Sequence, residues 1–151
     1  MRPPRGPIGV ELAGVAKAVS RAFDAALAAV GGTPPTWLIL LALKTHPAAN
    51  QRELAAVVGI QGATLTHHLD GMEADGLVAR RRDPTNRRVH VVSLTEAGEA
   101  AFHRMRVAAT AFDRQLRGGI PEEDIDRLRT VLATLARNVA SPSGTPEKTV
   151  H

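Results

Sequence analysis

Apolar residues recur every three or four positions through the first part of the chain, which is the period of an amphipathic helix. From Ile8 to Val30 they form one stripe, and the pair Gly31-Gly32 is expected to end that helix. Thr33 then provides an N-cap and Pro34 suits the first helical position. A second helix is therefore predicted through the segment WLILLALK.

Two shorter helices are predicted next, separated by a tight turn. Asn50 and Glu53 have the spacing of a capping box, with Asn in place of the usual Ser or Thr, and open a helix through Val58. Gly59 breaks the chain, and a further helix is expected from about Gln61 to Ala74. A short helix, a tight turn and a second helix are typical of a helix-turn-helix.

The periodicity then changes to two short β-capable runs, from Leu77 to Arg82 and from Arg88 to Leu94. Residues 83–87 between them contain Asp, Pro and Asn, which favour turns, so a hairpin with a polar tip is predicted. Thr95 is expected to cap a long helix, and Pro121 with the acids after it starts a last one.

This order predicts a mainly α protein with a small β-hairpin wing (α+β), a winged helix-turn-helix with long helices at both ends. Each terminal helix carries an apolar stripe that the lobe alone would struggle to cover, so both are expected to serve a dimer. The alternative is that both fold back onto the same lobe. We expect a flexible arm and first dimerisation helix over residues 1–32, a winged helix-turn-helix lobe over 33–94, the long and last helices over 95–140, and a disordered tail over 141–151.

Charge and composition reduce the number of functions that the chain could have. The 151-residue chain has a formal net charge of +4 and no cysteine, which excludes disulfides, thiolate zinc sites and thiol redox switches. Five arginines fall near the hairpin within nine residues, opposed only by Asp83: Arg80, Arg81, Arg82, Arg87 and Arg88. Such a run is either a solvated strip or an electrostatic contact to a polyanion. No signal peptide or membrane-length apolar run is evident, so a cytoplasmic protein is expected.

The helix before the hairpin favours DNA as the polyanion. Leu65, Leu69 and Met72 fall on its core face. The opposite face carries small and polar side chains: Gln61, Gly62, Thr64, Thr66, His67 and Asp70. Small residues let the backbone approach phosphate, and Gln, Thr and His hydrogen-bond base edges. An arginine on the hairpin tip can enter a narrow minor groove.

Between residues 53 and 102 the chain carries a series of motifs that match one known protein family. These are Glu53-Leu54-Ala55, Thr66, Leu69, Gly76-Leu77-Val78, Arg80, Arg88 and Leu94-Thr95-Glu96-Ala97-Gly98. In these motifs the chain resembles the MarR family of bacterial transcriptional regulators. The resemblance implies a homodimer with intertwined first and last helices, two DNA-binding lobes and often a small-molecule site between lobe and dimer region. No cofactor is implied.

The resemblance also implies which side chains carry the function. DNA-binding residues are expected to be Gln61, Gly62, Thr64, Thr66, His67, Arg80, Arg82, Arg87 and Arg88. A pocket where the second helix and the long helix meet the lobe could be lined by Trp37, Leu41, Met105 and Phe112, although each also suits plain core or dimer contact.

One position departs from the family pattern, in which an acid braces the wing arginine. Here the triplet is Asn86-Arg87-Arg88, and Asn offers a hydrogen bond but no ion pair. Asp83 could substitute as wing support. Arg88 is the first candidate for the minor groove and Arg87 the second, while Arg80 is expected to brace the hairpin or touch phosphate. If the missing charge matters, Asn86→Asp should tighten operator binding.

Other functions are weaker alternatives. No serine lies in a nucleophile elbow, and no Gly-rich phosphate loop or HExxH motif is present, so an enzyme is not expected. Adjacent His67 and His68 lack the i, i+4 spacing of helical metal ligands, so no metal is expected. Their titration could still give a pH response. A winged-helix interaction module without DNA binding remains the principal alternative.

Overall fold

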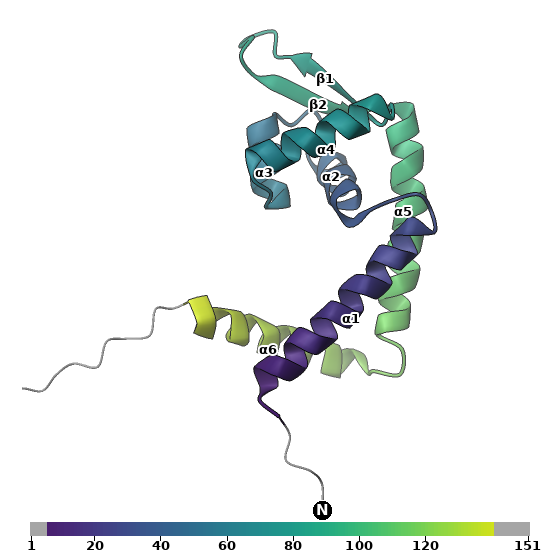
Figure 1. The fold of residues 1–151 in the computed structure, drawn as a ribbon, viewed down its shortest axis with the longest axis vertical. Helices are drawn as coiled ribbons and strands as arrows, with labels where there is room; N and C mark the ends of the chain where they lie inside the picture. Colours follow the sequence, from purple (N-terminus) through teal and green to yellow (C-terminus); the bar gives the residue numbers. More distant parts are fainter. Residues whose placement is uncertain (1–5, 141–151) are drawn as a thin grey trace, which may run out of the picture. The chain divides into compact units, whose positions relative to one another are not determined.

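The computed structural model describes residues 6–140. The expected tail over 141–151 and the first five residues of the expected arm lie outside the described residues. Eight elements follow one another in the order that was predicted (Figure 1): α1 (Ile8–Ala28), α2 (Pro34–Thr45), α3 (Gln51–Val58), α4 (Gly62–Ala74), β1 (Val78–Arg82), β2 (His90–Leu94), α5 (Glu96–Leu116) and α6 (Glu122–Ala140). A mainly helical fold with one small hairpin is therefore confirmed.

The predicted caps begin the helices of the lobe. The side chain of Thr33 accepts a hydrogen bond from the Thr36 amide at the start of α2. Asn50 Oδ1 accepts from the Glu53 amide at 2.8 Å, and its Nδ2 donates to the Glu53 carboxylate at 2.7 Å. Gly59 then ends α3 with a φ of 75°, the left-handed conformation that glycine adopts without steric cost. The amides of Gly59 and Ile60 both donate to the Ala55 carbonyl, which closes the tight turn between α3 and α4.

The two strands form an antiparallel hairpin, the wing, with Val78 opposite Leu94 and Arg82 opposite His90. A backbone bridge joins this hairpin to the chain before α3: the Val92 amide donates to the Ala49 carbonyl at 2.9 Å. Sequence periodicity gave no sign of this bridge, because it involves single residues. The start of α3 is thereby held beside the base of the wing.

Aliphatic side chains from α2, α3, α4 and the wing form the core of the lobe. Those with no exposed surface include Leu40, Leu54, Leu65, Leu69 and Val92. Leu65 and Leu69, with the nearly buried Met72, are the three core positions that the sequence predicted on α4. Burial of this face leaves the opposite face of α4 toward solvent.

Thr95 and Gly98 join the wing to α5. Thr95 Oγ1 accepts from the Gly98 amide at 3.0 Å and donates to the Gly76 carbonyl. A Cβ atom on Gly98 would lie 2.0 Å from the Leu77 carbonyl oxygen, so only glycine lets α5 pack this closely. The motif Leu94–Gly98 is therefore a structural junction.

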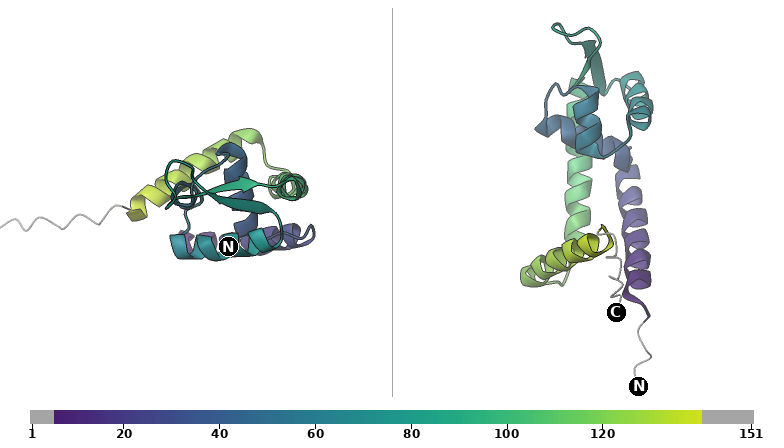
Figure 2. Two further views of the ribbon diagram at one scale, coloured as in Figure 1. Left: turned by 90° about the horizontal axis from the view of Figure 1, so that it is seen from above. Right: turned by 90° about the vertical axis from the view of Figure 1, so that its left-hand side faces the viewer.

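The chain divides into two compact units, residues Met1–Asp113 and Arg114–His151. Within the first, α1 and the body of α5 extend away from the α2–α4 lobe (Figure 2), and Phe23 packs on Phe112 with ring centroids 5.2 Å apart. In the second, α6 begins after Pro121, and Arg117 pairs with Glu122.

Candidate nucleic-acid interface

The solvent face of α4 carries the predicted polar residues. Gln61, Gly62, Thr64, Thr66 and His67 are all exposed, as expected for a helix that meets a ligand. His68 is half-buried, which fits its predicted position nearer the apolar side. The start of α4 thus exposes short side chains and the side-chain amide of Gln61, and no aliphatic side chain covers them.

The Thr66 side chain is exposed, yet two hydrogen bonds hold its hydroxyl in place. Its hydroxyl donates to the Gly62 carbonyl at 3.0 Å and accepts from Gln51 Nε2 on α3 at 3.3 Å. Gln51 therefore links the start of α3 to the middle of α4, and Thr66 contributes to holding these two helices in register.

Arg80 lies at the centre of a cluster of charges between the wing and α4. Its Nη2 donates to Asp70 Oδ1 at 2.6 Å and its Nε donates to Glu73 Oε2 at 3.2 Å. The hydrogen bond from Arg80 lowers the pKa of the Glu73 carboxyl below 4.5, and the same carboxylate raises the pKa of Arg80. Only 17% of the Arg80 side chain is exposed. Of its two expected roles, this geometry favours bracing.

The other four arginines of the hairpin are exposed: Arg81, Arg82, Arg87 and Arg88. Within residues 6–140, none of them has a carboxylate within salt-bridge distance, in contrast to Arg80. Their charges are available to an external anion.

The tip of the wing is held by its own hydrogen bonds. The Asp83 carboxylate accepts from the Thr85 hydroxyl at 2.7 Å and from the Thr85 amide at 2.8 Å, and these bonds lower the pKa of Asp83. Asn86 Oδ1 accepts from the Arg88 backbone amide at 3.2 Å. Both residues predicted as wing support therefore stabilise the turn, and they do so without contacting an arginine guanidinium.

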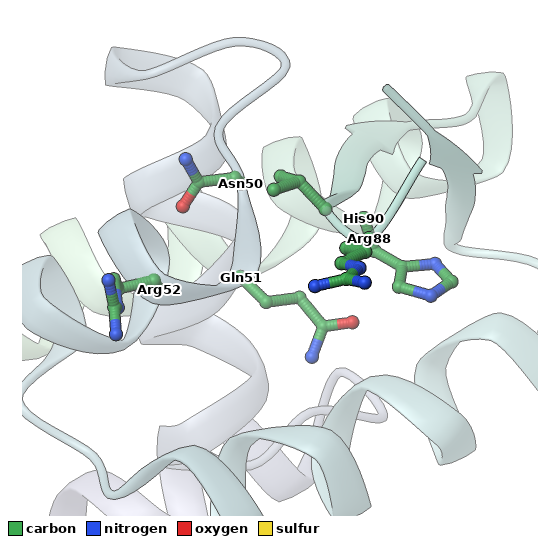
Figure 3. Close-up of a pocket in the computed structure, with 6 residues that line it drawn as sticks. Asn50, Gln51, Arg52, Arg88 and His90 are labelled. Carbon is green, nitrogen blue, oxygen red and sulfur yellow. The ribbon is translucent and has the colours of Figure 1, made fainter. Parts of the chain in front are cut away.

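Three hollows lie side by side where α3, α4 and the base of the wing meet, and Gln51 lines all of them. Figure 3 shows one of about 390 Å³, lined by Asn50, Gln51, Arg52, Arg88, Val89 and His90. In it, the Arg88 side chain points toward Gln51 at the start of α3. Thr66 and His90 meet across a second hollow, so α4 and the wing share one surface.

Sequence reasoning missed three residues of this surface: Gln51, Arg52 and His90. Gln51 and Arg52 lie in the first turn of a predicted helix and His90 lies in a predicted strand, and neither pattern marks them as DNA contacts. The bridge between Ala49 and Val92 brings these residues together. It joins positions more than forty residues apart, so no local sequence pattern reveals it.

The four candidates for an effector pocket have separate packing partners. Trp37 stacks on Phe102 at 5.6 Å, and Phe112 packs on Phe23. Met105 is buried and packs so closely on Gly32 that a Cβ atom there would collide with its side chain. Leu41 is 39% exposed. Trp37, Met105 and Phe112 thus have packing partners within the chain, and the pocket expected between these four residues stays a prediction.

Within residues 6–140, no group of three or more His, Cys, Asp or Glu side chains is placed to hold a metal ion. Over the same residues, every helix is too short or too polar to cross a membrane.

Comparison with known proteins agrees with this architecture. The MarR family model matches residues 33–90. The regulator YdgJ of Bacillus subtilis, described as an uncharacterised HTH-type transcriptional regulator, is 30% identical over 130 residues, which cover 85% of this chain and 77% of YdgJ.

Two solved structures of the repressor CouR have the same fold. CouR bound to a 23-mer DNA duplex superposes with a TM-score of 0.78 and 33% identity, over 86% of this chain and 92% of CouR. CouR bound to p-coumaroyl-CoA superposes with a TM-score of 0.75 and 32% identity, over 87% and 92% of the two chains. The chain, with its winged helix-turn-helix and its match to these regulators, belongs to the MarR family of transcriptional regulators.

Proposed function

We propose that this protein represses transcription by binding a pseudo-palindromic DNA operator as a homodimer. The observation that carries the proposal is the shared surface of α3, α4 and the wing. Gly62 and Thr66 of α4 line one hollow with Arg52, and Arg52 lines the next with Arg88. Among residues 6–140, neither arginine has a carboxylate within salt-bridge distance. CouR, with the same fold, has been captured on a DNA duplex. Because the family consists of transcriptional regulators, we do not propose an enzymatic function.

On α4, we assign base contacts to Gln61, Thr64 and His67, whose side chains are exposed on the first turns of the helix. Gly62 allows the backbone to approach a phosphate closely. Thr66 keeps its place in the interface as a residue that orients α4 through Gln51. The amide, hydroxyl and imidazole groups all match hydrogen-bonding positions on base edges in the major groove.

On the wing, we assign Arg87 to the minor groove ahead of Arg88, because Arg88 points toward α3 in the free protein (Figure 3). Arg82 is assigned to the phosphate backbone. Arg80 supports the wing through Asp70 and Glu73 rather than contacting DNA directly.

We propose that residues 1–32 and 95–140 form the dimer and that 33–94 form the DNA-binding lobe. On α1, Ile8, Val10 and Val15 are 60–69% exposed in the single chain. Val131 and Val139 of α6 are 53% and 86% exposed. Water-exposed aliphatic stripes of this extent favour burial against a second copy. A two-fold dimer would then meet two half-sites about 34 Å apart.

The test is selection of bound sequences from random duplex DNA with the purified protein, followed by measurement of affinity at two salt concentrations. We expect an inverted repeat, and an affinity that falls about 10³–10⁵-fold between about 50 and 200 mM salt, as for a protein that contacts ~6–10 phosphates. Failure to enrich any sequence, with no duplex binding at low salt, would favour the interaction module instead.

We further propose that a small molecule releases the operator, with Trp37, Leu41, Met105 and Phe112 near its site. p-Coumaroyl-CoA, which CouR binds, is the first compound to test, with free p-coumarate and coenzyme A as controls. Loss of the DNA complex with the thioester alone would identify the ligand class.

Because the proposed target is the bacterial chromosome, we place the protein in the cytoplasm.

A further inference from the structure

Four side chains join α2 of the lobe to α5: Trp37 and Lys44 of α2, and Glu99 and Phe102 of α5. We call this set the α2–α5 seam. Trp37 stacks on Phe102, with ring centroids 5.6 Å apart and planes inclined by 9°. The Lys44 ammonium lies 5.5 Å from the centre of the Phe102 ring and donates to Glu99 Oε2 at 2.9 Å. Lys44 therefore contacts both residues that α5 contributes to the seam.

The lobe is attached to α5 at a second point, on the side of the wing. Gly98 packs against the Leu77 carbonyl, and the Thr95 side chain donates to the Gly76 carbonyl. Gly98 and Glu99 are consecutive on α5, so they face directions about 100° apart around the helix axis. One attachment would let the lobe turn about α5, whereas two attachments on different faces fix its angle.

The pair of Lys44 and Glu99 is a geometric link rather than a source of stability. Their side chains are 35% and 43% exposed, and ion pairs this accessible to water contribute little to folding. The Phe102 ring beneath Lys44 is only 5% exposed, and its face attracts the ammonium. The ring and the carboxylate together hold the end of α2 at one place on α5.

We propose that Lys44 is a positioning residue, which sets the angle between the lobe and α5 and thereby the half-site spacing that the dimer accepts. The inference rests on the DNA binding and the dimer proposed above, and it adds a residue that selects the spacing. One base pair moves a half-site by about 3.4 Å and turns it by about 35°, because a turn of 10–10.5 base pairs is about 34–36 Å long. A lobe fixed on α5 loses contacts after such a shift, whereas a lobe that can turn keeps them.

The test compares the selected operator with duplexes whose half-sites are one base pair closer together or further apart. Fluorescence anisotropy gives the affinity for each duplex, and the ratio of these affinities is the spacing preference. The wild-type protein should prefer the selected spacing. Lys44→Met keeps an aliphatic stem over Phe102 but removes the ammonium. It should narrow the preference by up to about fivefold for each protomer, the limit for one exposed ion pair.

A duplex with one half-site separates positioning from recognition. Lys44→Met should bind it as the wild type does, because the surface of α4 and the wing is unchanged. Lys44→Arg keeps the cation and should retain the spacing preference. Thermal unfolding of each variant shows that it is folded before its affinity is measured.

Substitutions of Glu99 test whether Lys44 acts through this partner. Glu99→Gln should narrow the preference as much as Lys44→Met does, and the double variant should narrow it no further, because both changes remove one interaction. Glu96→Gln removes the same charge from the exposed first turn of α5, and it should leave the preference unchanged.

The outcomes distinguish this inference from the proposed function. If the wild-type protein selects no inverted repeat or binds no duplex, the proposed function fails. If it binds the inverted repeat but accepts all three spacings alike, the lobe is not held at one angle and the inference is overturned. It is also overturned if Lys44→Met keeps the full preference, or weakens every spacing and the single half-site equally.

Discussion

Arg80 of the wing donates to Asp70 of α4 across 2.6 Å, which ties the hairpin to the helix that is proposed to contact bases. Glu73, one turn further along α4, accepts from the Arg80 Nε and also from its backbone amide at 3.1 Å. The base of the wing therefore cannot move relative to α4 without breaking these bonds.

Removing this tie should weaken DNA binding without removing a phosphate contact. For Arg80→Gln we expect an affinity about tenfold lower and a salt slope that stays near the wild-type value, because positioning is lost rather than counterion release. Anisotropy titrations at several salt concentrations measure both quantities. A drop of about 0.9 per half-site would instead mean that Arg80 contacts a phosphate.

The lowered pKa of Glu73 predicts a contribution to stability that depends on pH. The ionised carboxylate stabilises the folded state above its ordinary pKa of 4.5, and this contribution is lost as the pH falls through the lower folded value. Glu73→Gln keeps an acceptor for the Arg80 amide but removes the charge. Its urea midpoint should lie below that of the wild type near neutral pH, and the gap should close in acid. A gap that persists in acid would point to lost packing.

Gly98 and Gly71 offer a matched pair of substitutions. Gly98→Ala places a Cβ atom 2.0 Å from the Leu77 carbonyl oxygen, and we expect it to cost about 3 kcal/mol or to prevent folding. Gly71→Ala lies within α4 with nothing within 4 Å of the new atom. It should stabilise by about 0.5–1 kcal/mol. Urea unfolding measures both variants, and equal effects would contradict the close junction.

Asn86→Asp tests how the wing is braced. The missing acid of the family pattern led to an expectation of tighter binding, but Asn86 bonds the Arg88 amide, and an aspartate would keep that bond. The tie through Arg80 already holds the wing. We now expect binding weakened a few-fold by the added negative charge, with the difference shrinking at higher salt. Tighter binding would show that an acid here acts on the Arg88 guanidinium.

Most of the fold could be predicted because its signals are local. The Thr33 and Asn50 caps, the Gly59 turn and the change from helical to strand period each depend on residues a few positions apart. The first helix ends at Ala28 rather than Val30, because the Val30 and Gly31 amides bond the Leu27 and Ala28 carbonyls in a tighter turn. End fraying of this kind is not encoded by hydrophobic spacing.

The interface was only partly predictable, for the same reason. The face of α4 follows from helical period, so its exposed residues were found. The role of Arg80 depends on partners in another element, namely Asp70 and Glu73 of α4. Sequence distance hides such pairs, and charge alone could not separate a bracing arginine from one that remains open to an anion.

The bond between Ala49 and Val92 divides the hairpin into an anchored base and an independent tip. Beyond Arg82 and His90, the hydrogen bonds of the tip run only among its own residues, 83–89. The tip can therefore be lengthened, shortened or exchanged for that of another regulator while the lobe keeps its shape. The minor-groove contact proposed for the wing is thus a transplantable property, which evolution or a designer can change separately from the base contacts proposed for α4.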